Sequence, residues 1–503
     1  MKKKSFFILF FLLPAFFESF AQTLEILPIP KQLQLKTSDF KIFQPRNIFL
    51  GTDLISQKDL WFSDFLKNLN KKSKTFWKVN ARIESLTSQG IIFTLPQSLG
   101  KNYLVHNEVF KNSEAYQIFF EPNQIIITAS SAKGFYYASL TLLQALLVNQ
   151  QDILFPLGCI TDWPSFKIRG LSDDISRGQV PTKSSIKKTI RFLSAYKMNA
   201  YLFYLEDMVR LAHYPEIGRG RGALTSQEIK EIIDYAKNYF IEIIPVYQTL
   251  AHYETLLIKP EFFDIAEYPG STCLSIANAK AKEFLKNSLS EIASLFESPF
   301  FHMGGDESWD MGLGKSKEWV KKLGFGAALS EHYLYVYQLL KSMNKKPILY
   351  SDMLLKSPDA IKKLPNDAII MDWQYHPNPP YASLNFFKKK GIDFWVSPAL
   401  WNWRKVFPRY THGLSNIYHL NREAFSAGAK GSIASAWGDD GAEGLREFLY
   451  FGYAYAAASS WYPEQSLPAK IIPMILNNFF GTKDRSSVEI FESLSALSFL
   501  SDY

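Results

Sequence analysis

The chain has 503 residues with 47% hydrophobic content, which predicts two or more globular domains, each with a core of its own. Its formal net charge of +8 is spread over short lysine pairs, so the composition indicates no nucleic-acid partner. The only two cysteines, Cys159 and Cys273, are far apart, which argues against a disulfide framework and against a cysteine zinc site.

The first residues, MKKKSFFILFFLLPAFFESFAQ, have the features of an export signal. Lysines precede an apolar run that is too short to span a bilayer, and Ser19-Phe20-Ala21 fits a small-x-small cleavage site. We therefore expect residues 1–21 to be a signal peptide, and the mature protein to be periplasmic or extracellular. A membrane anchor is the alternative, which Pro14 and the short run disfavour. No later stretch is apolar enough to predict a membrane span.

Residues 22–160 predict a small N-terminal α/β domain. Strand-like runs such as GIIFTL and YQIFFEPNQIIITAS alternate with turns. The apolar spacing from Phe135 to Leu147 is that of a partly buried helix. The segment TDWPSF, around Pro164, is interpreted as the connection to the next domain.

From Lys167 onward, a short β-rich run followed by an amphipathic helical stretch occurs eight times. Eight βα units predict a (β/α)₈ TIM barrel over residues 161–461, with its active site at the C-terminal ends of the strands. A doubly wound sheet is the alternative, but the glycine-rich phosphate loop that it requires is absent. Residues 462–503 are expected to form a C-terminal helical extension. The predicted strands are IRGLSDDI, NAYLFYLE, IEIIPVYQ, PFFHMGG, KPILYSD, AIIMDWQY, IDFWVSPAL and GSIASAW.

Acidic, basic and aromatic side chains follow the ends of these predicted strands, where a barrel carries its chemistry. Carboxyl groups and an arginine suit glycosidic chemistry and hydrogen bonds to hydroxyls, and indoles suit the apolar faces of a sugar ring. The sequence thus predicts a sugar site with a glycan as substrate, and the family resemblance described below narrows this to a glycan or amino-sugar oligosaccharide. The residues are Asp173, Asp174, Arg177, Glu206, Asp207, His252, Asp306, Glu307, Asp352, Trp373, Tyr375, Trp401, Trp403, Trp437, Asp439 and Asp440.

The segment HMGGDE places two adjacent acids, Asp306 and Glu307, after the fourth predicted strand. Glycosidic cleavage needs one protonated carboxyl group for the leaving oxygen and a second group that stabilises positive charge. Adjacent carboxylates repel each other, which favours one acid and one anion. The two glycines allow the backbone to turn so that both side chains enter the barrel mouth. A solvated polar loop is the alternative interpretation of this segment.

The chain resembles glycoside hydrolase family 20, the β-N-acetylhexosaminidases. The marker of this family is His-x-Gly-Gly-Asp-Glu, which is present here as HMGGDE, His302 to Glu307. GFYYASLTLLQALL is similar to the helix that closes the family's N-terminal domain, and ITDWPSFKIRGLSDDISRG to the entry into its barrel. LPNDAIIMDWQ and IASAWGDD resemble its sixth and eighth strands.

The resemblance implies an exo-acting enzyme that removes terminal β-linked N-acetylhexosamine (GlcNAc or GalNAc) with retention of configuration. Glu307 would be the general acid and base, and Asp306 would orient the 2-acetamido group, whose oxygen attacks the anomeric carbon. No cofactor and no metal are expected. The resemblance implies substrate-binding roles for Arg177, His252, Trp373, Tyr375, Trp401, Trp437 and Asp439.

The chain also departs from the family pattern. The family has a tyrosine after the seventh strand that binds the acetamido oxygen, whereas this chain has Trp401 and Trp403 there. IPVYQTLAHYE lacks the usual acidic residue before His252, and Asp439 stands where a glutamate is usual. Because Tyr375 lies near in sequence, the tyrosine's role could have moved to it.

Two other functions stay open from the sequence. A retaining β-glycosidase would use an enzyme nucleophile at Asp174, Glu206 or Asp352 together with Glu307. A non-catalytic barrel would bind glycans without turnover. The sequence leaves open the choice between gluco and galacto sugars, any sugar decoration and the oligomeric state.

Overall fold

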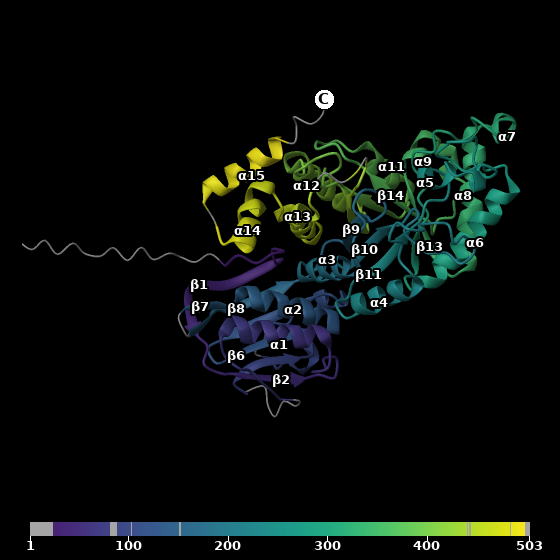
Figure 1. Cartoon of the computed structure of the whole chain (residues 1–503). Coiled ribbons are helices and arrows are strands. Elements are labelled where there is room, and N and C mark those ends of the chain that lie inside the picture. Colours follow the sequence, from purple (N-terminus) through teal and green to yellow (C-terminus); the bar gives the residue numbers. More distant parts are fainter. Residues whose placement is uncertain are drawn as a thin grey trace, which may run out of the picture.

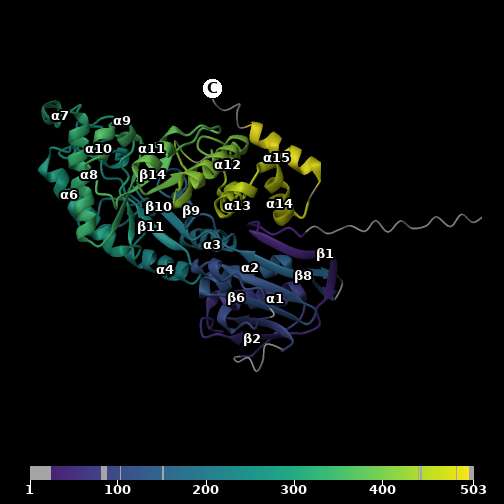
Figure 2. The ribbon, with the colours of Figure 1, turned by 180° about the vertical axis from the view of Figure 1, so that it is seen from behind.

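The computed structural model of the protein describes residues 24–80, 88–101, 103–149, 152–439, 441, 444–482 and 484–497. Within these ranges the chain forms an open sheet domain followed by a closed barrel. The two bodies lie next to each other (Figure 1), and the same arrangement is seen from behind (Figure 2). The expected signal peptide and Asp440 lie outside the described residues.

The N-terminal domain is a mixed sheet in the order β1-β8-β5-β6-β4-β2-β3, with β7 paired to β8. The expected run YQIFFEPNQIIITAS is the antiparallel hairpin of β5 and β6. The two helices of this domain, Leu60–Ser73 and Ala132–Ala145, face the barrel. Trp61 of the first packs against Phe240, and the hydroxyl of Tyr136 of the second forms a hydrogen bond with Ser194. The elements are β1 (Gln32–Ile42), β2 (Asn47–Gly51), α1 (Leu60–Ser73), β3 (Lys78–Asn80), β4 (Gly90–Thr94), β5 (Tyr116–Glu121), β6 (Gln124–Ala129), α2 (Ala132–Ala145), β7 (Leu147–Asn149) and β8 (Asp152–Asp162).

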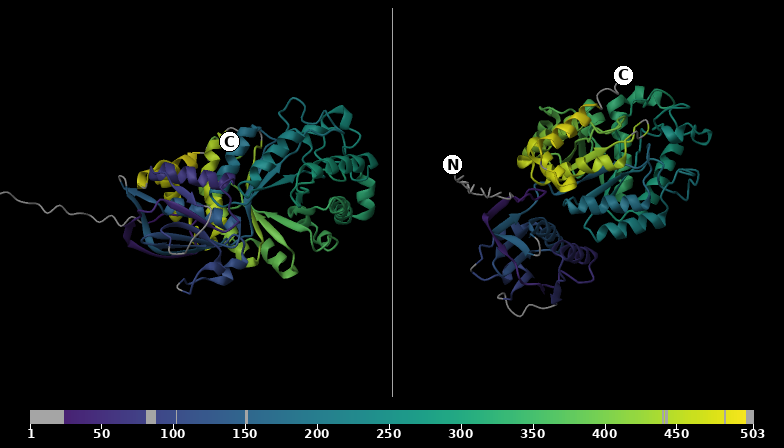
Figure 3. Two further views of the ribbon diagram at one scale, coloured as in Figure 1. Left: turned by 90° about the horizontal axis from the view of Figure 1, so that it is seen from below. Right: turned by 60° about the vertical axis from the view of Figure 1, so that its left-hand side comes forward.

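The second domain is a closed parallel barrel in the order β10-β11-β12-β13-β14-β15-β16-β9, which confirms the predicted (β/α)₈ fold. Each of the eight predicted strands is present. The right-hand view of Figure 3 shows the N-terminal domain below the barrel. The strands are β9 (Ile168–Asp174), β10 (Ala200–Tyr204), β11 (Glu242–Val246), β12 (Phe300–His302), β13 (Lys346–Tyr350), β14 (Ile369–Trp373), β15 (Phe394–Ser397) and β16 (Gly431–Ala436).

Helices surround the barrel, and local sequence fixes their ends. The helix α4 starts at a capping box, in which Glu228 N–H donates to Thr225 Oγ1 and Thr225 N–H donates to Glu228 Oε2. The helix α12 ends at Gly428 in the left-handed conformation. The helices α14 and α15 pack on α12 and α13. The helices are α3 (Lys183–Ala195), α4 (Ser226–Lys237), α5 (Glu254–Leu257), α6 (Ala279–Leu295), α7 (Lys317–Leu323), α8 (Phe325–Ser342), α9 (Asp352–Lys356), α10 (Pro358–Ile361), α11 (Ala382–Lys390), α12 (Tyr410–Ala427), α13 (Leu449–Trp461), α14 (Pro468–Phe480) and α15 (Arg485–Leu497).

Strand residues alternate between the barrel interior and the helix layer. In β10, Ala200, Leu202 and Tyr204 belong to the interior cluster, whereas Tyr201 and Phe203 pack in the outer core. Matching side chains from the other strands, such as Ile, Val, Met and Trp, fill the interior. The barrel is therefore a packed core, and its ligand site is confined to the strand ends.

A buried polar cluster joins the two domains. Lys197, which is fully buried, places its Nζ 3.1 Å from Asp162 Oδ2 and 2.7 Å from Tyr116 Oη. Trp461 Nε1 donates to Asp162 Oδ1 at 2.9 Å. Because these residues come from the sheet, from the loop after α3 and from α13, the cluster fixes the sheet domain against the barrel.

Candidate active site

The HMGGDE turn depends on both of its glycines. Gly304 and Gly305 have φ values of +66° and +90°, which L side chains rarely adopt. A Cβ atom on Gly304 would lie 1.9 Å from Gln248 Oε1. The N–H of Gly304 donates to His302 Nδ1 at 3.0 Å, and burial lowers the pKa of His302 to about 3, so this imidazole is a neutral acceptor. The turn directs the next two residues into the barrel mouth.

Several non-glycine residues at this end of the barrel have a left-handed backbone. Glu206, His252, Glu307 and Trp401 are not glycines, yet their φ values are +39°, +59°, +48° and +56°. They follow β10, β11, β12 and β15, respectively. Such conformations cost about 1–3 kcal/mol each and are concentrated at functional sites. Lys197, Phe240 and Asn344 have the same conformation at the other end of the barrel, so the side chains, and not the backbone alone, identify the functional end.

His252 lies between the two adjacent acids. Its Nε2 is 3.5 Å from Asp306 Oδ2 and 3.6 Å from Glu307 Oε2, and its Nδ1 is 3.6 Å from Glu254 Oε1. Burial opposes the charged imidazolium, but the charge of Asp306 prevails and raises the pKa of His252 to about 11. The imidazole is therefore a cation at neutral pH, in contact with both acids.

Asp306 and Glu307 differ in their surroundings. Asp306 is buried, and it accepts a hydrogen bond from Gln248 Nε2 at 2.9 Å. Burial acts to raise its pKa, but the charge of His252 and the hydrogen bonds from His252 and Gln248 lower it. The side chain of Glu307 is 45% exposed, and burial together with the charge of Asp306 raises its pKa. The pair thus consists of an anion and a neighbour that retains its proton to higher pH.

Arg177 is held as a fixed cation at the opposite wall. Its Nε donates to Asp174 Oδ2 at 2.7 Å, and its Nη1 forms an ion pair with Asp439. The guanidinium also lies 5.2 Å from the ring centre of Tyr204 and 5.3 Å from that of Trp437. A guanidinium fixed in this way presents a rigid fork of donors, which suits recognition of vicinal hydroxyls.

Aromatic side chains form the remaining wall. The rings of Trp373 and Tyr375 lie 5.0 Å apart, and Trp403 lies 5.5 Å from Tyr375. Trp437 Nε1 donates to Tyr375 Oη at 2.8 Å. This bond occupies one lone pair of the phenol, and Ser435 is a second hydrogen-bonding neighbour of the same oxygen, so the O–H hydrogen can be donated to Ser435 or to a ligand.

These residues enclose a cavity of about 200 Å³. It is smaller than the ~300–1,000 Å³ that is typical of pockets for drug-sized ligands, so it suits one sugar ring. Within the described part of the chain, its lining residues are Arg177, Tyr204, His252, Asp306, Glu307, Trp373, Tyr375, Trp403, Trp437 and Asp439.

The structure brings together the site residues expected from the sequence, with the exception of Trp401. That residue is not among the described residues that line the cavity. Its Nε1 donates to the carbonyl oxygen of Tyr375 at 2.7 Å, and its ring stacks on Trp403 at 5.0 Å. Trp401 therefore supports the wall, and Trp403 faces the cavity. The chain leaves strand geometry after Ser397, and its backbone is left-handed at Trp401, so strand alternation does not decide which of the two indoles faces the cavity.

Two contact residues were missed at the sequence level. Tyr204 is the last residue of β10 and lines the cavity, a position that the alternation of Ala200 and Leu202 could have indicated. Gln248 also accepts the Gly305 N–H at 3.2 Å, so it holds both the turn and Asp306. In the sequence, only the position of Gln248 after the third predicted strand could have indicated this role.

Several of the strand-end acids have structural partners. Asp174 accepts hydrogen bonds from the N–H groups of Arg177 and Gly438, both at 3.0 Å, in addition to the Arg177 side chain. Both oxygens of Asp207 accept from Arg221 Nη1, at 2.6 and 2.7 Å. These carboxylates fix the loops around the site.

The other acids also lie away from the cavity lining. Asp173 pairs with Arg446. Glu206 is buried, and its Oε1 lies 3.6 Å from Arg177 Nε. Burial raises the pKa of Glu206 to about 8. Asp352 accepts the backbone N–H of Glu307 at 3.1 Å. None of these acids lines the described cavity, and neither does Asp174.

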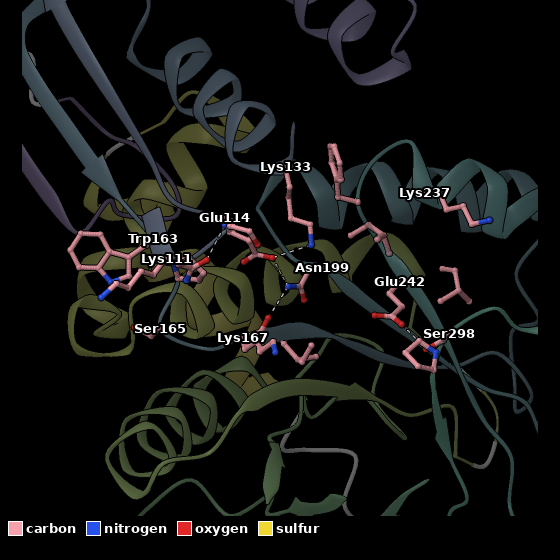
Figure 4. Close-up of a pocket in the computed structure, with 18 of the residues that line it drawn as sticks. Lys111, Glu114, Lys133, Trp163, Ser165, Lys167, Asn199, Lys237, Glu242 and Ser298 are labelled. Carbon is pink, nitrogen blue, oxygen red and sulfur yellow. Dashed lines mark hydrogen bonds and ion pairs between the residues drawn. The ribbon is translucent and has the colours of Figure 1, made fainter. Parts of the chain in front are cut away.

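A larger cavity, of about 1150 Å³, lies at the other end of the barrel, between the two domains (Figure 4). Its polar groups bond to one another: Glu114 binds Lys133 and Asn199, and Glu242 accepts from Ser298 Oγ. It adjoins the N-terminal ends of the strands, where a barrel has no chemistry. We interpret it as the joint between the domains.

Neither a metal centre nor a membrane helix stands out in the described ranges. There, no group of three or more His, Cys, Asp or Glu side chains could hold a metal ion. In the same ranges, no helix has both the length and the apolar character needed to cross a bilayer.

The chain resembles known proteins over most of its length. Residues 166–401 match the model for the glycosyl hydrolase family 20 catalytic domain, and residues 23–163 match that for glycosyl hydrolase family 20, domain 2. A beta-hexosaminidase of Vibrio furnissii is 26% identical over 431 residues, which are 78% of this chain and 65% of that protein. Beta-hexosaminidase subunit A1 of Dictyostelium discoideum is 24% identical over 354 residues, which are 66% and 64% of the two chains. The chain thus spans slightly less than two thirds of these relatives.

Solved structures show the same fold. The chitobiase of Flavobacterium johnsoniae superposes with a TM-score of 0.71 at 23% identity, covering 90% of this chain and 71% of that one. The β-N-acetylhexosaminidase of Bacteroides fragilis gives a TM-score of 0.67 at 21% identity, covering 87% and 91%. Since the two family models account for the sheet domain and for most of the barrel, the chain belongs to glycosyl hydrolase family 20.

Proposed function

We propose that this protein is an exo-acting β-N-acetylhexosaminidase, which hydrolyses the terminal β-linked N-acetylhexosamine of a glycan. The observation that carries the proposal is the placement of Asp306, His252 and Glu307 at the wall of a cavity that suits one sugar ring. Membership of family 20 and similarity to beta-hexosaminidases support it. A small cavity favours release of a single terminal residue.

Glu307 is the general acid in this proposal. Its raised pKa keeps a proton for the leaving oxygen, and its partial exposure places it at the cavity mouth, where the rest of the glycan departs. After the aglycone leaves, the resulting carboxylate can activate water. The same residue thus acts first as an acid and then as a base.

Asp306 orients the 2-acetamido group and stabilises the positive charge that develops on its nitrogen. Its buried carboxylate, with a lowered pKa, stays ionised for this role. The acetamido oxygen then attacks the anomeric carbon, so the nucleophile is already tethered to the reacting centre. The three acids proposed from the sequence as alternative nucleophiles do not line the described cavity, which favours this mechanism.

Tyr375 takes the place of the tyrosine that the family has after the seventh strand. Its oxygen accepts from Trp437, so its own hydrogen can be donated to the acetamido oxygen. Trp373, Trp403 and Trp437 offer ring faces to the sugar. Arg177 and Asp439 bind the outer hydroxyls.

The proposed site of action is outside the cytoplasm, as the expected signal peptide implies. Expression of the full chain followed by N-terminal sequencing of the exported form tests this point. A mature start near Gln22 supports export, and recovery of the uncleaved chain in the cytoplasm contradicts it.

A matched pair of chromogenic β-glycosides tests the activity. The two substrates share one leaving group and differ only in carrying a 2-acetamido or a 2-hydroxyl group. Hydrolysis confined to the acetamido member is the expected result. Equal hydrolysis of both would place the nucleophile on the protein, and binding of sugar without hydrolysis of either would support a non-catalytic barrel.

A further inference from the structure

Asp352 contacts the backbone of the proposed general acid, Glu307, but does not itself line the described cavity. It is the first residue of α9, directly after β13, and its Oδ2 accepts the backbone N–H of Glu307 at 3.1 Å. Glu307 lies beyond the end of β12 at His302 and has a left-handed backbone, so no neighbouring strand supplies an acceptor for its N–H. A buried N–H without an acceptor is costly. Asp352 therefore provides the acceptor that this strained conformation requires.

The second carboxylate oxygen of Asp352 faces the sugar wall. Asp352 Oδ1 and Trp373 Nε1 are both buried. The indole N–H of Trp373 interacts with the Asp352 carboxyl and acts to lower its pKa, whereas burial and the charge of Asp306 raise it. The Asp352 carboxyl group thus lies between the general acid and the wall that carries the sugar ring.

We propose that Asp352 is a positioning residue, which holds the backbone of Glu307 in place and links it to the Trp373 wall of the sugar cavity. The inference rests on the proposed hydrolase function and adds a requirement to it. The carboxyl group of Glu307 must reach the leaving oxygen within hydrogen-bonding distance. Loss of the Asp352 acceptor lets the turn relax, and a misplacement of about 1 Å can lower a rate by about 100-fold.

Two variants separate this role from general stability. Asp352→Asn keeps an oxygen that can accept the Glu307 N–H, whereas Asp352→Ala removes it. We expect Asp352→Asn to keep kcat within about threefold of the wild type, and Asp352→Ala to lower kcat by roughly 10–100-fold with little change in KM.

Leaving-group dependence provides the decisive readout. The rate is measured for two β-N-acetylhexosaminides, a nitrophenyl glycoside and an alkyl glycoside, whose poor leaving group needs the proton more. Asp352→Ala should lose more rate on the alkyl glycoside. Asp207→Ala is the control, since it also removes a buried carboxylate at a strand end but has Arg221 as its partner. This control should lower both rates by the same factor.

The outcomes distinguish the inference from the proposed function. An active, acetamido-dependent wild type whose Asp352→Ala variant loses both rates equally would overturn the positioning role alone. The positioning role is also overturned if Asp352→Asn is as impaired as Asp352→Ala, because the retained acceptor would then have no effect. A wild type that hydrolyses neither acetamido substrate would instead contradict the proposed function.

Discussion

His252 Nε2 lies 3.5 Å from Asp306 Oδ2, and the same nitrogen lies 3.6 Å from Glu307 Oε2. One imidazolium therefore acts on both acids of the pair. It lowers the pKa of Asp306, and it also opposes the burial and the Asp306 charge that raise the pKa of Glu307. In the proposed mechanism the two acids have opposite roles, with Asp306 as the anion and Glu307 as the proton donor.

Replacement of His252 by Asn should move both limbs of the pH profile to higher pH. Without the cation, the pKa values of Asp306 and Glu307 both rise. The acid limb of kcat/KM follows Asp306 and the basic limb follows Glu307. The measurement is kcat/KM of the free enzyme against pH for the acetamido substrate. Limbs that stay in place would show that His252 does not act on the pair electrostatically.

Replacement of Glu307 by Gln should abolish proton donation while binding is kept. We expect kcat to fall by about 10²–10⁴ on an alkyl glycoside, and by less on a nitrophenyl glycoside. The inhibition constant of free N-acetylhexosamine, measured by competition, should stay close to the wild-type value. Asp306→Asn is the matched comparison and should impair both substrates equally, since the acetamido group attacks in each. An unchanged rate of Glu307→Gln on the alkyl glycoside would remove Glu307 from the acid role.

Gln248 donates to Asp306 Oδ1 and accepts the Gly305 N–H. Gln248→Glu keeps the acceptor for Gly305 but places a second carboxylate beside Asp306. The pKa of Asp306 should then rise, and the acid limb of kcat/KM should move to higher pH. Gln248→Leu, which has neither a donor nor an acceptor, should lower kcat without introducing a charge. If Gln248→Glu keeps the wild-type acid limb, the close contact with Asp306 is wrong.

The hydrophobic pattern was sufficient to predict the barrel and its eight strands, because buried parallel strands and amphipathic helices carry strong periodic signals. The positions of Arg177, Asp306 and Glu307 followed from their places at strand ends. The choice between Trp401 and Trp403 did not follow, because both lie in the loop beyond the end of β15, where the backbone is left-handed at Trp401 and strand alternation no longer applies. Periodicity carries no information about such a residue.

Long-range contacts were also beyond the sequence pattern. From the sequence, Asp352 was an acid at a strand end and one of three alternative nucleophiles, whereas its bond to the Glu307 backbone, which joins two βα units, could not be predicted. The joint between the domains could not be predicted either. Lys197 is a buried lysine in a loop, and no local sequence pattern indicates that it binds Tyr116 and Asp162 on distant elements.

Glu206 should make the stability of the protein depend on pH. Burial raises its pKa to about 8 from the ordinary value of 4.5. The folded state thus keeps a proton that the unfolded chain releases, so the stabilisation is fully present below pH 4.5 and is lost as pH rises through about 8. Glu206→Gln stays neutral throughout, and its Tm should fall less than that of the wild type between about pH 5 and about pH 9. Parallel Tm curves for the two proteins would contradict the raised pKa.

Replacement of Lys197 by Met should destabilise the joint between the domains. The variant leaves the fully buried Asp162 without its cation, and removing one partner of a buried ion pair costs about 3–5 kcal/mol. The double variant Lys197→Met/Asp162→Asn removes both charges and should be less destabilised than the single variant. The free energy of unfolding is measured with denaturant for both variants. A double variant that is the less stable of the two would show that the hydrogen bonds which Asp162 accepts from Tyr116 and Trp461, and not its pairing with Lys197, hold the sheet domain on the barrel.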